Sequence, residues 1–159
     1  MHNIRPIRPE DKALLERGIG LLSLESAYRR FLAPKSAFTL AELRYLTEVD
    51  FADHYALVAV DAEQPRHLIA VGRWVRDPEH PDAAEVAVVV GDAWQGRGIG
   101  TELGLALADA ARARGIRRFT ATMLTENRRA QRLFAKISDR LESHPQGPVT
   151  ELSAELAAA

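Results

Sequence analysis

The chain has 159 residues, the size of one ordinary domain and enough to bury a core without disulfide or metal staples. It contains no cysteine, which excludes disulfides, thiolate metal sites and a cysteine nucleophile. Its formal net charge of −1 leaves no overall basic field for nucleic acid or membranes, and it has neither a membrane-length apolar run nor a signal-peptide core. We therefore expect a soluble, cytoplasmic protein with a single domain over residues 1–159.

The first part of the chain predicts one strand followed by helices. Residues His2–Arg8 (HNIRPIR) alternate loosely and form the expected strand, and Pro9 suits the first position of the helix that follows. Ser23 suits the N-cap of a second helix, with Ser26 as the alternative, and Thr39 suits that of a third, because their hydroxyl groups can accept from backbone amides. Glu42 lies three residues after Thr39 and completes the pattern of a capping box.

From Tyr55 onward, strand and helix patterns alternate. Strands are expected at Tyr55–Asp61, His67–Asp77, Val86–Val90, Ile116–Thr125, Asp139–His144 and Val149–Leu156. Helices are expected from about Gly98 to Arg114, with Gly115 as a C-cap, and from Asn127 onward. This order predicts an α/β fold (an α+β mixed sheet) in which helices flank a central mixed sheet.

Residues Glu85–Thr101 (EVAVVVGDAWQGRGIGT) join a β-branched strand to a glycine-rich turn and the start of a long helix. The first amides of a helix have no partner within it, and the helix dipole favours negative charge there. Gly96, Gly98 and Gly100 let a phosphate approach the main chain closely. The stretch therefore predicts a site in which the backbone amides of Gly96–Thr101 bind a phosphate or pyrophosphate.

Three phosphate-binding motifs compete for this stretch. A Walker A loop needs a Gly-Lys-Ser/Thr ending and a dinucleotide fingerprint needs G-x-G-x-x-G, and neither is present. The third motif, Q-x-x-G-x-G followed by a helix, matches Gln95–Gly100. At these residues the chain resembles the GNAT N-acetyltransferase superfamily, in which this motif binds the pyrophosphate of acetyl-CoA. Asn127 and Ala130, followed by Leu133 and Phe134, resemble the downstream N-x-x-A-x-x-L-Y/F helix of that family.

A narrower resemblance covers Glu25–Asp61 together with the later AEVAVVVGDAWQGRGIG. These segments look like the acetyltransferase domain of bacterial protein-lysine acetyltransferases, which act on metabolic enzymes such as acyl-CoA synthetases. Many of those proteins carry an additional regulatory or acyl-CoA-synthetase-like domain, for which this chain leaves no room. The resemblance implies a catalytic domain on its own, with acetyl-CoA as co-substrate and a protein lysine as acceptor. We expect a monomer or a homodimer, with no metal, nucleic acid or membrane partner.

The resemblance to the GNAT superfamily also implies which residues hold acetyl-CoA. The amides of Gly96–Thr101 would bind the pyrophosphate, and the main chain of Val88–Val90 would pair with the pantetheine arm and polarise the thioester carbonyl. Asn127 would contact the cofactor or cap its helix, and Phe134 would pack on the pantetheine arm or belong to the core. The full set of expected cofactor contacts is Val88, Val89, Val90, Gln95, Gly96, Arg97, Gly98, Ile99, Gly100, Thr101, Asn127, Ala130 and Phe134. Further arginines are expected at the rim near the nucleotide: Arg128, Arg129 and Arg132.

Glu85 is the expected general base, because a glutamate in this place takes the amine proton in the lysine acetyltransferases that the chain resembles. Apolar neighbours would raise its proton affinity. The alternative is a solvated glutamate at a strand edge. His54 and His80 are rival bases by their chemistry, although both are expected in surface loops. Many GNAT enzymes protonate the leaving thiolate with a tyrosine, and that place here resembles Phe134, which has no proton to give.

The acceptor site is expected beside the second predicted helix. Tyr28 and Arg29, with Arg30 next to them, are expected acceptor contacts by the family resemblance, and a solvated basic face is the alternative. Trp74 and Trp94 are expected to serve packing rather than function. Two other functions stay open: acetylation of a small amine or an N-terminus, and a non-catalytic acyl-CoA sensor, because the usual acid is replaced.

Overall fold

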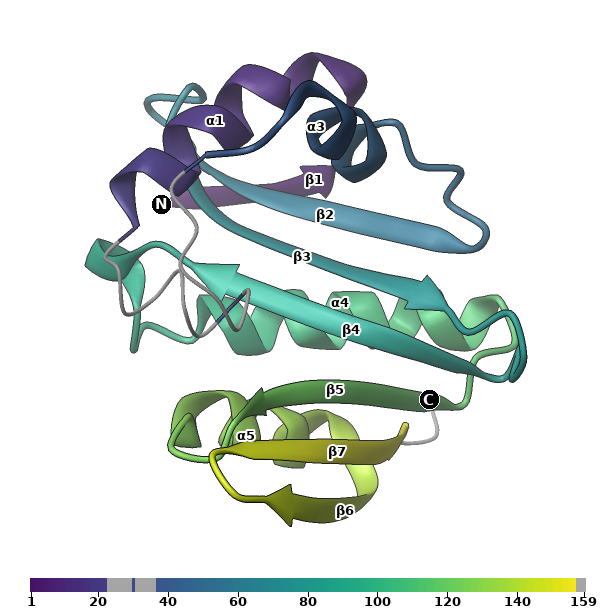
Figure 1. Ribbon diagram of the computed structural model, residues 1–159. Helices are drawn as coiled ribbons and strands as arrows, with labels where there is room; N and C mark the ends of the chain where they lie inside the picture. The colour runs from purple at the N-terminus through teal and green to yellow at the C-terminus, as the bar shows by residue number, and fades with distance from the viewer. Residues whose placement is uncertain (23–29, 31–36, 157–159) are drawn as a thin grey trace.

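The chain folds around one sheet whose seven described strands follow the order β1-β2-β3-β4-β5-β7-β6 (Figure 1). The computed structural model describes residues 1–22, Arg30 and residues 37–156. The strands are β1 His2–Pro6, β2 His54–Asp61, β3 Leu68–Arg76, β4 Ala83–Val90, β5 Arg118–Leu124, β6 Ser138–Gln146 and β7 Val149–Leu156. Neighbouring strands pair antiparallel except β4 and β5, which are parallel, so the predicted mixed sheet is confirmed.

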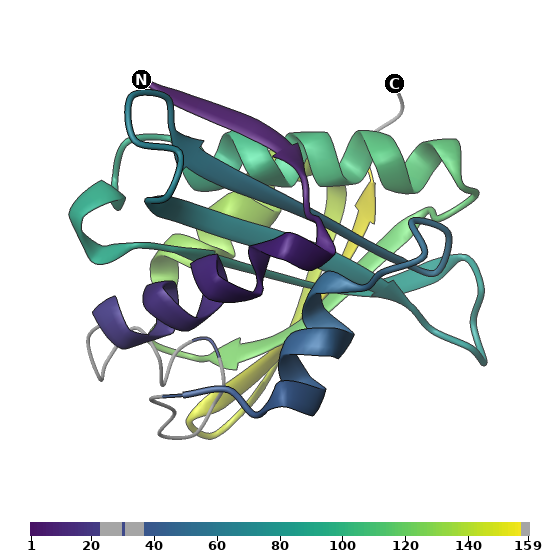
Figure 2. The same ribbon diagram turned by 90° about the horizontal axis from the view of Figure 1, so that it is seen from above.

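Helices cover both faces of this sheet, with α1 and α3 on one face and α4 and α5 on the other (Figures 1 and 2). The helical elements are the short η1 Pro9–Asp11, α1 Lys12–Leu21, α3 Leu40–Thr47, the short η2 Asp92–Trp94, α4 Ile99–Ala113 and α5 Arg128–Ile137. The helix expected after Ser23 lies outside the described residues except at Arg30. Among the helices that the structure describes, none is long and apolar enough to cross a membrane.

Two predicted helix starts are confirmed in atomic detail. The Glu42 amide donates to Thr39 Oγ1 at 3.1 Å, and the Thr39 amide donates to Glu42 Oε1 at 2.9 Å, which is the predicted capping box of α3. The Ala130 amide donates to Asn127 Oδ1 at 3.3 Å. Asn127 therefore caps α5, which is one of the two roles expected for it.

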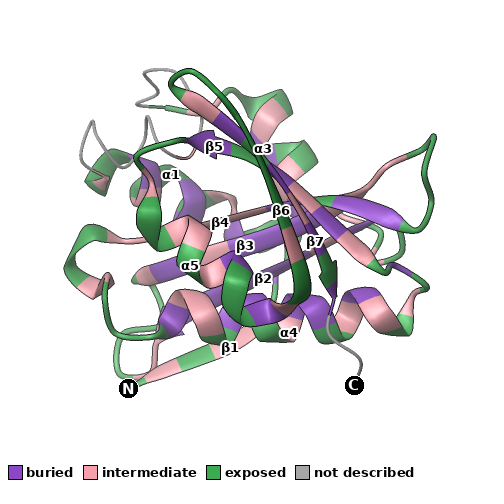
Figure 3. Cartoon of the chain, turned by 90° about the horizontal axis from the view of Figure 1, so that it is seen from below, coloured by how far each residue is buried: buried purple, intermediate pink, exposed green. Residues whose placement is uncertain are grey.

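The larger hydrophobic core lies between the sheet and the pair α4 and α5. Trp74, Phe119 and Leu107 are fully buried in it, and the Trp74 Nε1–H donates to the Leu107 carbonyl at 3.1 Å. A smaller core beneath α1 and α3 contains Leu15 and Val58. Figure 3 shows buried positions along the central strands, whereas the edge strand β6 is largely exposed. The two cores hold β4 at the middle of the molecule.

The parallel strands β4 and β5 pair over a short distance and then separate (Figure 1). Their register runs from Ala83 opposite Arg118 to Glu85 opposite Thr120, although β4 continues to Val90. On its other side, β4 pairs with β3 along nearly its whole length. The second half of β4 therefore has one paired edge and one edge that faces away from β3 toward the diverging β5.

Candidate functional site

The glycine-rich turn between η2 and α4 forms one end of the site. Gly96 and Gly98 adopt φ angles of 78° and 83°, a left-handed conformation that costs other residues about 1–2 kcal/mol. Gly98 is the N-cap of α4 and has no side chain to occupy the first amides of the helix. The main chain at the start of α4 therefore meets the cleft described next, with the positive end of the helix dipole behind it.

A cleft of about 300 Å³ lies between this turn, the second half of β4 and the face of α5. Of the expected cofactor contacts, the residues that line it are Val88, Val89, Val90, Gln95, Gly96, Gly98, Ile99, Gly100, Thr101, Asn127 and Ala130. Arg97 instead places its guanidinium over the Trp94 ring, 5.0 Å from the ring centroid. Phe134 is 5% exposed and belongs to the core, which is the second of the two roles expected for it.

The cleft is also lined by residues that were not expected as cofactor contacts. Trp94, expected to serve packing rather than function, packs against the core as predicted and also lines the cleft. Leu133 and Lys136 extend the face of α5 that carries Arg129 and Arg132. Their helical spacing was the signal that could have identified them, because residues three and four apart share one face of a helix.

Gln95 connects the end of β4 to α5. Its Nε2 donates to the Val90 carbonyl at 3.0 Å, and its Oε1 accepts from Arg129 Nη1 at 2.9 Å. The side chain of this motif glutamine thus holds the turn and the arginine in place in addition to lining the cleft.

Strand alternation determines which backbone groups of β4 face the cleft. The Gly91 amide donates to the Ile69 carbonyl of β3 at 2.7 Å. In an antiparallel pair, residues alternate between directing both main-chain groups toward the partner and away from it. Val89 therefore directs its amide and carbonyl toward β3, whereas Val88 and Val90 direct theirs to the edge that diverges from β5.

The charges around the cleft suit an anion. The cationic side chains that line it are Arg30, Arg129, Arg132 and Lys136. Among the described residues that line it, no side chain is acidic. Together with the N-terminus of α4, they form an environment that favours a polyanionic ligand.

A second cavity of about 510 Å³ lies on the face of the sheet that carries α3. Glu85 lines it with an exposed side chain, and Thr120, its register partner on β5, lines it as well. Arg30 lines both this cavity and the cleft, and its charge interacts with that of Glu85. The expected acceptor contacts Tyr28 and Arg29 lie outside the described residues.

The expectation that His54 lies in a surface loop is wrong. His54 begins β2, is 8% exposed, and its Nε2 lies 3.0 Å from Arg73 Nη1. Burial, followed by the charge of Arg73, lowers the pKa of His54 to about 4, so the ring is neutral at pH 7 and accepts from the guanidinium. His80 does lie in an exposed loop, beside Asp77 at 3.2 Å. Neither histidine lines the cavity that contains Glu85.

Comparison with known proteins agrees with this geometry. Residues 20–138 match the model of the Acetyltransferase (GNAT) family. Over 138 residues the chain is 41% identical to Acetyltransferase Pat of Mycolicibacterium smegmatis, a match that covers 87% of this chain and 40% of that protein. The chain thus spans less than half the length of this relative.

Solved structures show the same fold. The crystal structure of the GNAT domain of S. lividans PAT is 32% identical with a TM-score of 0.86, covering 98% of this chain and 90% of that one. The structure of yncA, a putative acetyltransferase from Salmonella typhimurium with its cofactor acetyl-CoA, has a TM-score of 0.75 at 18% identity, covering 99% and 95% of the two chains.

The chain therefore belongs to the GNAT family of acetyltransferases, whose members take acetyl-CoA as the acetyl donor. The resemblance found in the Gln95–Gly100 motif is confirmed.

Proposed function

We propose that this chain transfers the acetyl group of acetyl-CoA to a primary amine of a protein lysine, with Glu85 as the general base. The observation that carries the proposal is that one strand, β4, lines both cavities. Val88–Val90 line the cleft that suits a polyanion, and Glu85 lines the cavity on the other face of the sheet. A thioester held along the second half of β4 would lie beside an amine that enters from the side of Glu85.

The cleft would bind acetyl-CoA through main-chain groups and cations. The amides of the turn and of the first residues of α4 would hold the pyrophosphate, with Arg129 and Arg132 near it. The main-chain groups of Val88 and Val90 would pair with the pantetheine arm, as an added strand does at a sheet edge. The Val88 amide would then stabilise the oxyanion that develops on the thioester carbonyl.

The reaction needs one base and one leaving thiolate. Glu85 would take a proton from the acceptor ammonium, directly or through water, and the free amine would attack the thioester carbon. The C–S bond then breaks and CoA leaves as a thiolate, which is a stable anion because thiols have a pKa of about 8.5. The excess proton that remains on the attacking nitrogen is released to the thiolate or to solvent, which leaves the neutral amide. Such a leaving group needs no acid, so the core position of Phe134 is compatible with turnover.

The identity of the acceptor is supported by similarity. The chain is 41% identical to Acetyltransferase Pat over 138 residues. The resemblance of Glu25–Asp61 to protein-lysine acetyltransferases points the same way. The cavity of about 510 Å³ is large enough for the four-carbon stem of a lysine. We further propose that residues 1–159 act as one domain, in the cytoplasm.

The test measures CoA release from acetyl-CoA with a panel of acceptor proteins and small amines. Glu85→Gln should lower kcat by at least about a hundredfold, the usual share of a general base, and leave acetyl-CoA binding unchanged. Glu79→Gln, at an exposed loop position, serves as the matched control and should retain full activity. The protein would instead be a non-catalytic acyl-CoA sensor if it bound acetyl-CoA but released no CoA with any acceptor, and if wild type and Glu85→Gln behaved alike in both measurements.

A further inference from the structure

Arg73 is a buried cation in the cavity that contains Glu85. Its side chain extends from β3 and the residue is 5% exposed, yet it lines this cavity. Its Nη1 donates to the Leu46 carbonyl at 2.9 Å and to His54 Nε2 at 3.0 Å, and both of these acceptors are neutral. Within the described part of the chain, no carboxylate is paired with this guanidinium. Burial of a charge without a counter-ion is unfavourable, so an anionic ligand would be stabilised at this position.

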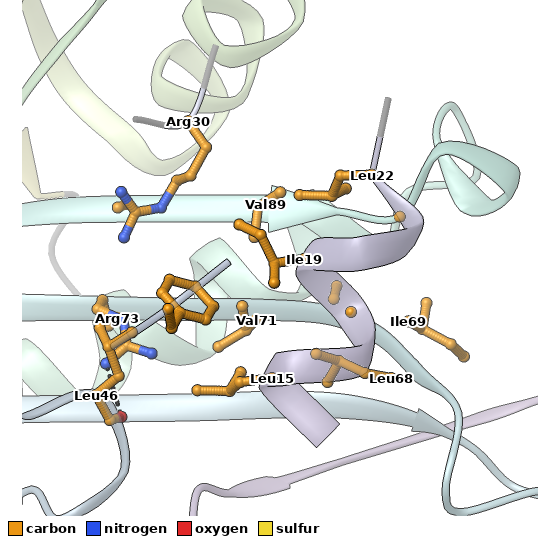
Figure 4. A pocket seen from close by; sticks show the side chains of 15 residues that line it. Leu15, Ile19, Leu22, Arg30, Leu46, Leu68, Ile69, Val71, Arg73 and Val89 are labelled. Carbon is orange, nitrogen blue, oxygen red and sulfur yellow. Dashed lines mark hydrogen bonds between the residues drawn. The ribbon is translucent and has the colours of Figure 1, made fainter. Parts of the chain in front are cut away.

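A second guanidinium, that of Arg30, lines the same cavity. Both arginines also line a neighbouring pocket, which does not contain Glu85 and whose lining is largely apolar, with Ile19, Val71 and Val89 among its residues (Figure 4). Burial and then the nearby charge of Arg30 lower the pKa of Arg73 to about 9. Two like charges that are partly withdrawn from water attract an anion more strongly than they would in water.

The other charged groups of the cavity are already engaged. Arg76 is paired with Asp53 at 2.9 Å and donates to backbone carbonyls. Asp77 accepts from backbone amides and lies beside His80. Glu85 interacts with Arg30 rather than with Arg73. Among the described residues, therefore, no carboxylate neutralises the positive charge of Arg73.

The strand register places this charge close to the proposed reacting amine. Glu85 on β4 is opposite Val75 on β3, and Arg73 is opposite Ala87. Arg73 is thus the diagonal neighbour of Glu85 on the same face of the sheet, and such neighbours lie about 7–8 Å apart. An acceptor whose amine meets Glu85 would present any nearby acidic group to Arg73.

We propose that Arg73 and Arg30 form an anion subsite that binds a carboxylate of the acceptor next to its amine. The inference rests on the proposed function, because it takes the cavity of Glu85 as the acceptor site. The carboxylate can come from an aspartate or glutamate beside a protein lysine, or from the acceptor itself when the acceptor is a small amino acid. Arg73 is the specificity-determining residue of this subsite.

The experiment compares matched acceptors. Two lysine peptides differ only by aspartate or asparagine next to the lysine, and a small-molecule pair is 4-aminobutanoate and 4-aminobutanamide. Wild type should show at least about a tenfold higher kcat/KM for the charged member, as expected for a charge-assisted hydrogen bond. Arg73→Gln should reduce this ratio to about one while the neutral member keeps most of its rate, and Arg73→Lys should restore part of the ratio.

Because Arg73→Gln changes contacts to Leu46 and His54, Arg30→Gln is a second variant that should also lower the ratio. Arg66→Gln, at an exposed loop position, is the control that should leave the ratio unchanged. Equal rates for both members of both pairs would overturn the subsite and leave acetyl transfer intact. A preference confined to the small-molecule pair, and lost in Arg73→Gln, would support the subsite and refute a lysine acceptor.

Discussion

At the scale of single residues, His54 and Arg73 depend on one another. His54 Nε2 accepts from Arg73 Nη1 at 3.0 Å, so its other ring nitrogen carries the proton. The Tyr45 ring of α3 packs beside the His54 ring, with the two ring centroids 5.0 Å apart. The neutral histidine orients the arginine without cancelling its charge, which leaves the arginine able to attract an anion.

This arrangement predicts a dependence of stability on pH. The pKa of His54 is about 4 in the folded protein, against its ordinary value of 6.5 once the chain unfolds, so the unfolded chain binds more protons between these values. The contribution of His54 to the free energy of unfolding is complete above about pH 6.5 and is lost as the pH falls toward 4. Between pH 7 and pH 5 the loss from this group is about 2 kcal/mol in the free energy of unfolding.

His54→Gln should remove this part of the pH dependence, because the amide oxygen can still accept from Arg73 and does not titrate. Urea unfolding at pH 7 and pH 5 measures the difference. The control is His67→Gln, at an exposed position, and its free energy of unfolding should change with pH as that of wild type does. An equal loss of the free energy of unfolding between pH 7 and pH 5 in wild type and His54→Gln would show that His54 is not the source of this pH dependence.

At the scale of elements, the turn before α4 combines two requirements. Gly98 must adopt a positive φ to start the helix, and its empty Cβ position leaves the amides of α4 accessible. An added Cβ would meet no protein atom within 4 Å. A side chain at Gly98 would therefore cost conformational energy and occupy the place of the ligand.

Gly98→Ala should lower the free energy of unfolding by about 1 kcal/mol and weaken acetyl-CoA binding at least about tenfold. Gly147→Ala is the matched control, since Gly147 has a φ of 66° in the β6–β7 turn and is equally free of close neighbours. It should show a similar loss of stability with unchanged acetyl-CoA affinity by calorimetry. Equal affinities in the two variants would remove the turn from the cofactor site.

At the scale of the whole molecule, the sheet has two parts that meet at the short β4–β5 pairing. Pairing between them ends at Glu85 and Thr120, and α4 packs across β2, β3 and β4 while contacting α5. The cleft lies where β4 leaves β5, with α5 as its far wall. A ligand there would connect the two parts of the sheet.

Acetyl-CoA should therefore stabilise the whole fold. At a free concentration of one hundred times Kd, the free energy of unfolding should rise by about 2.7 kcal/mol, measured as an increase in Tm. Hydrogen exchange should slow both at Val88 and Val90 and along α5. Glu85→Gln should show the same increase in Tm with acetyl-CoA as wild type, whereas Gly98→Trp should show none. A full increase in Tm for Gly98→Trp would contradict the placement of acetyl-CoA in this cleft.

The sequence could predict the parts of the site that depend on neighbours along the chain. The capping box of Thr39, the cap at Asn127 and the strand–turn–helix around Gly98 all follow from residues within a few positions. The side chain of Phe134 could not be assigned, because its helical spacing suits the core and the cleft equally.

The sequence by itself therefore determined the fold class, the glycine turn and the family motif, since local backbone preferences and periodicity carry that information. The tertiary structure alone decided which distant side chains share a cavity. It brought Arg30, Arg73 and Glu85 together from three separate segments, and it buried His54 behind them. The physical reason is that a shift of one residue in strand register moves a side chain to the other face of the sheet, and this register depends on packing between segments far apart in the chain.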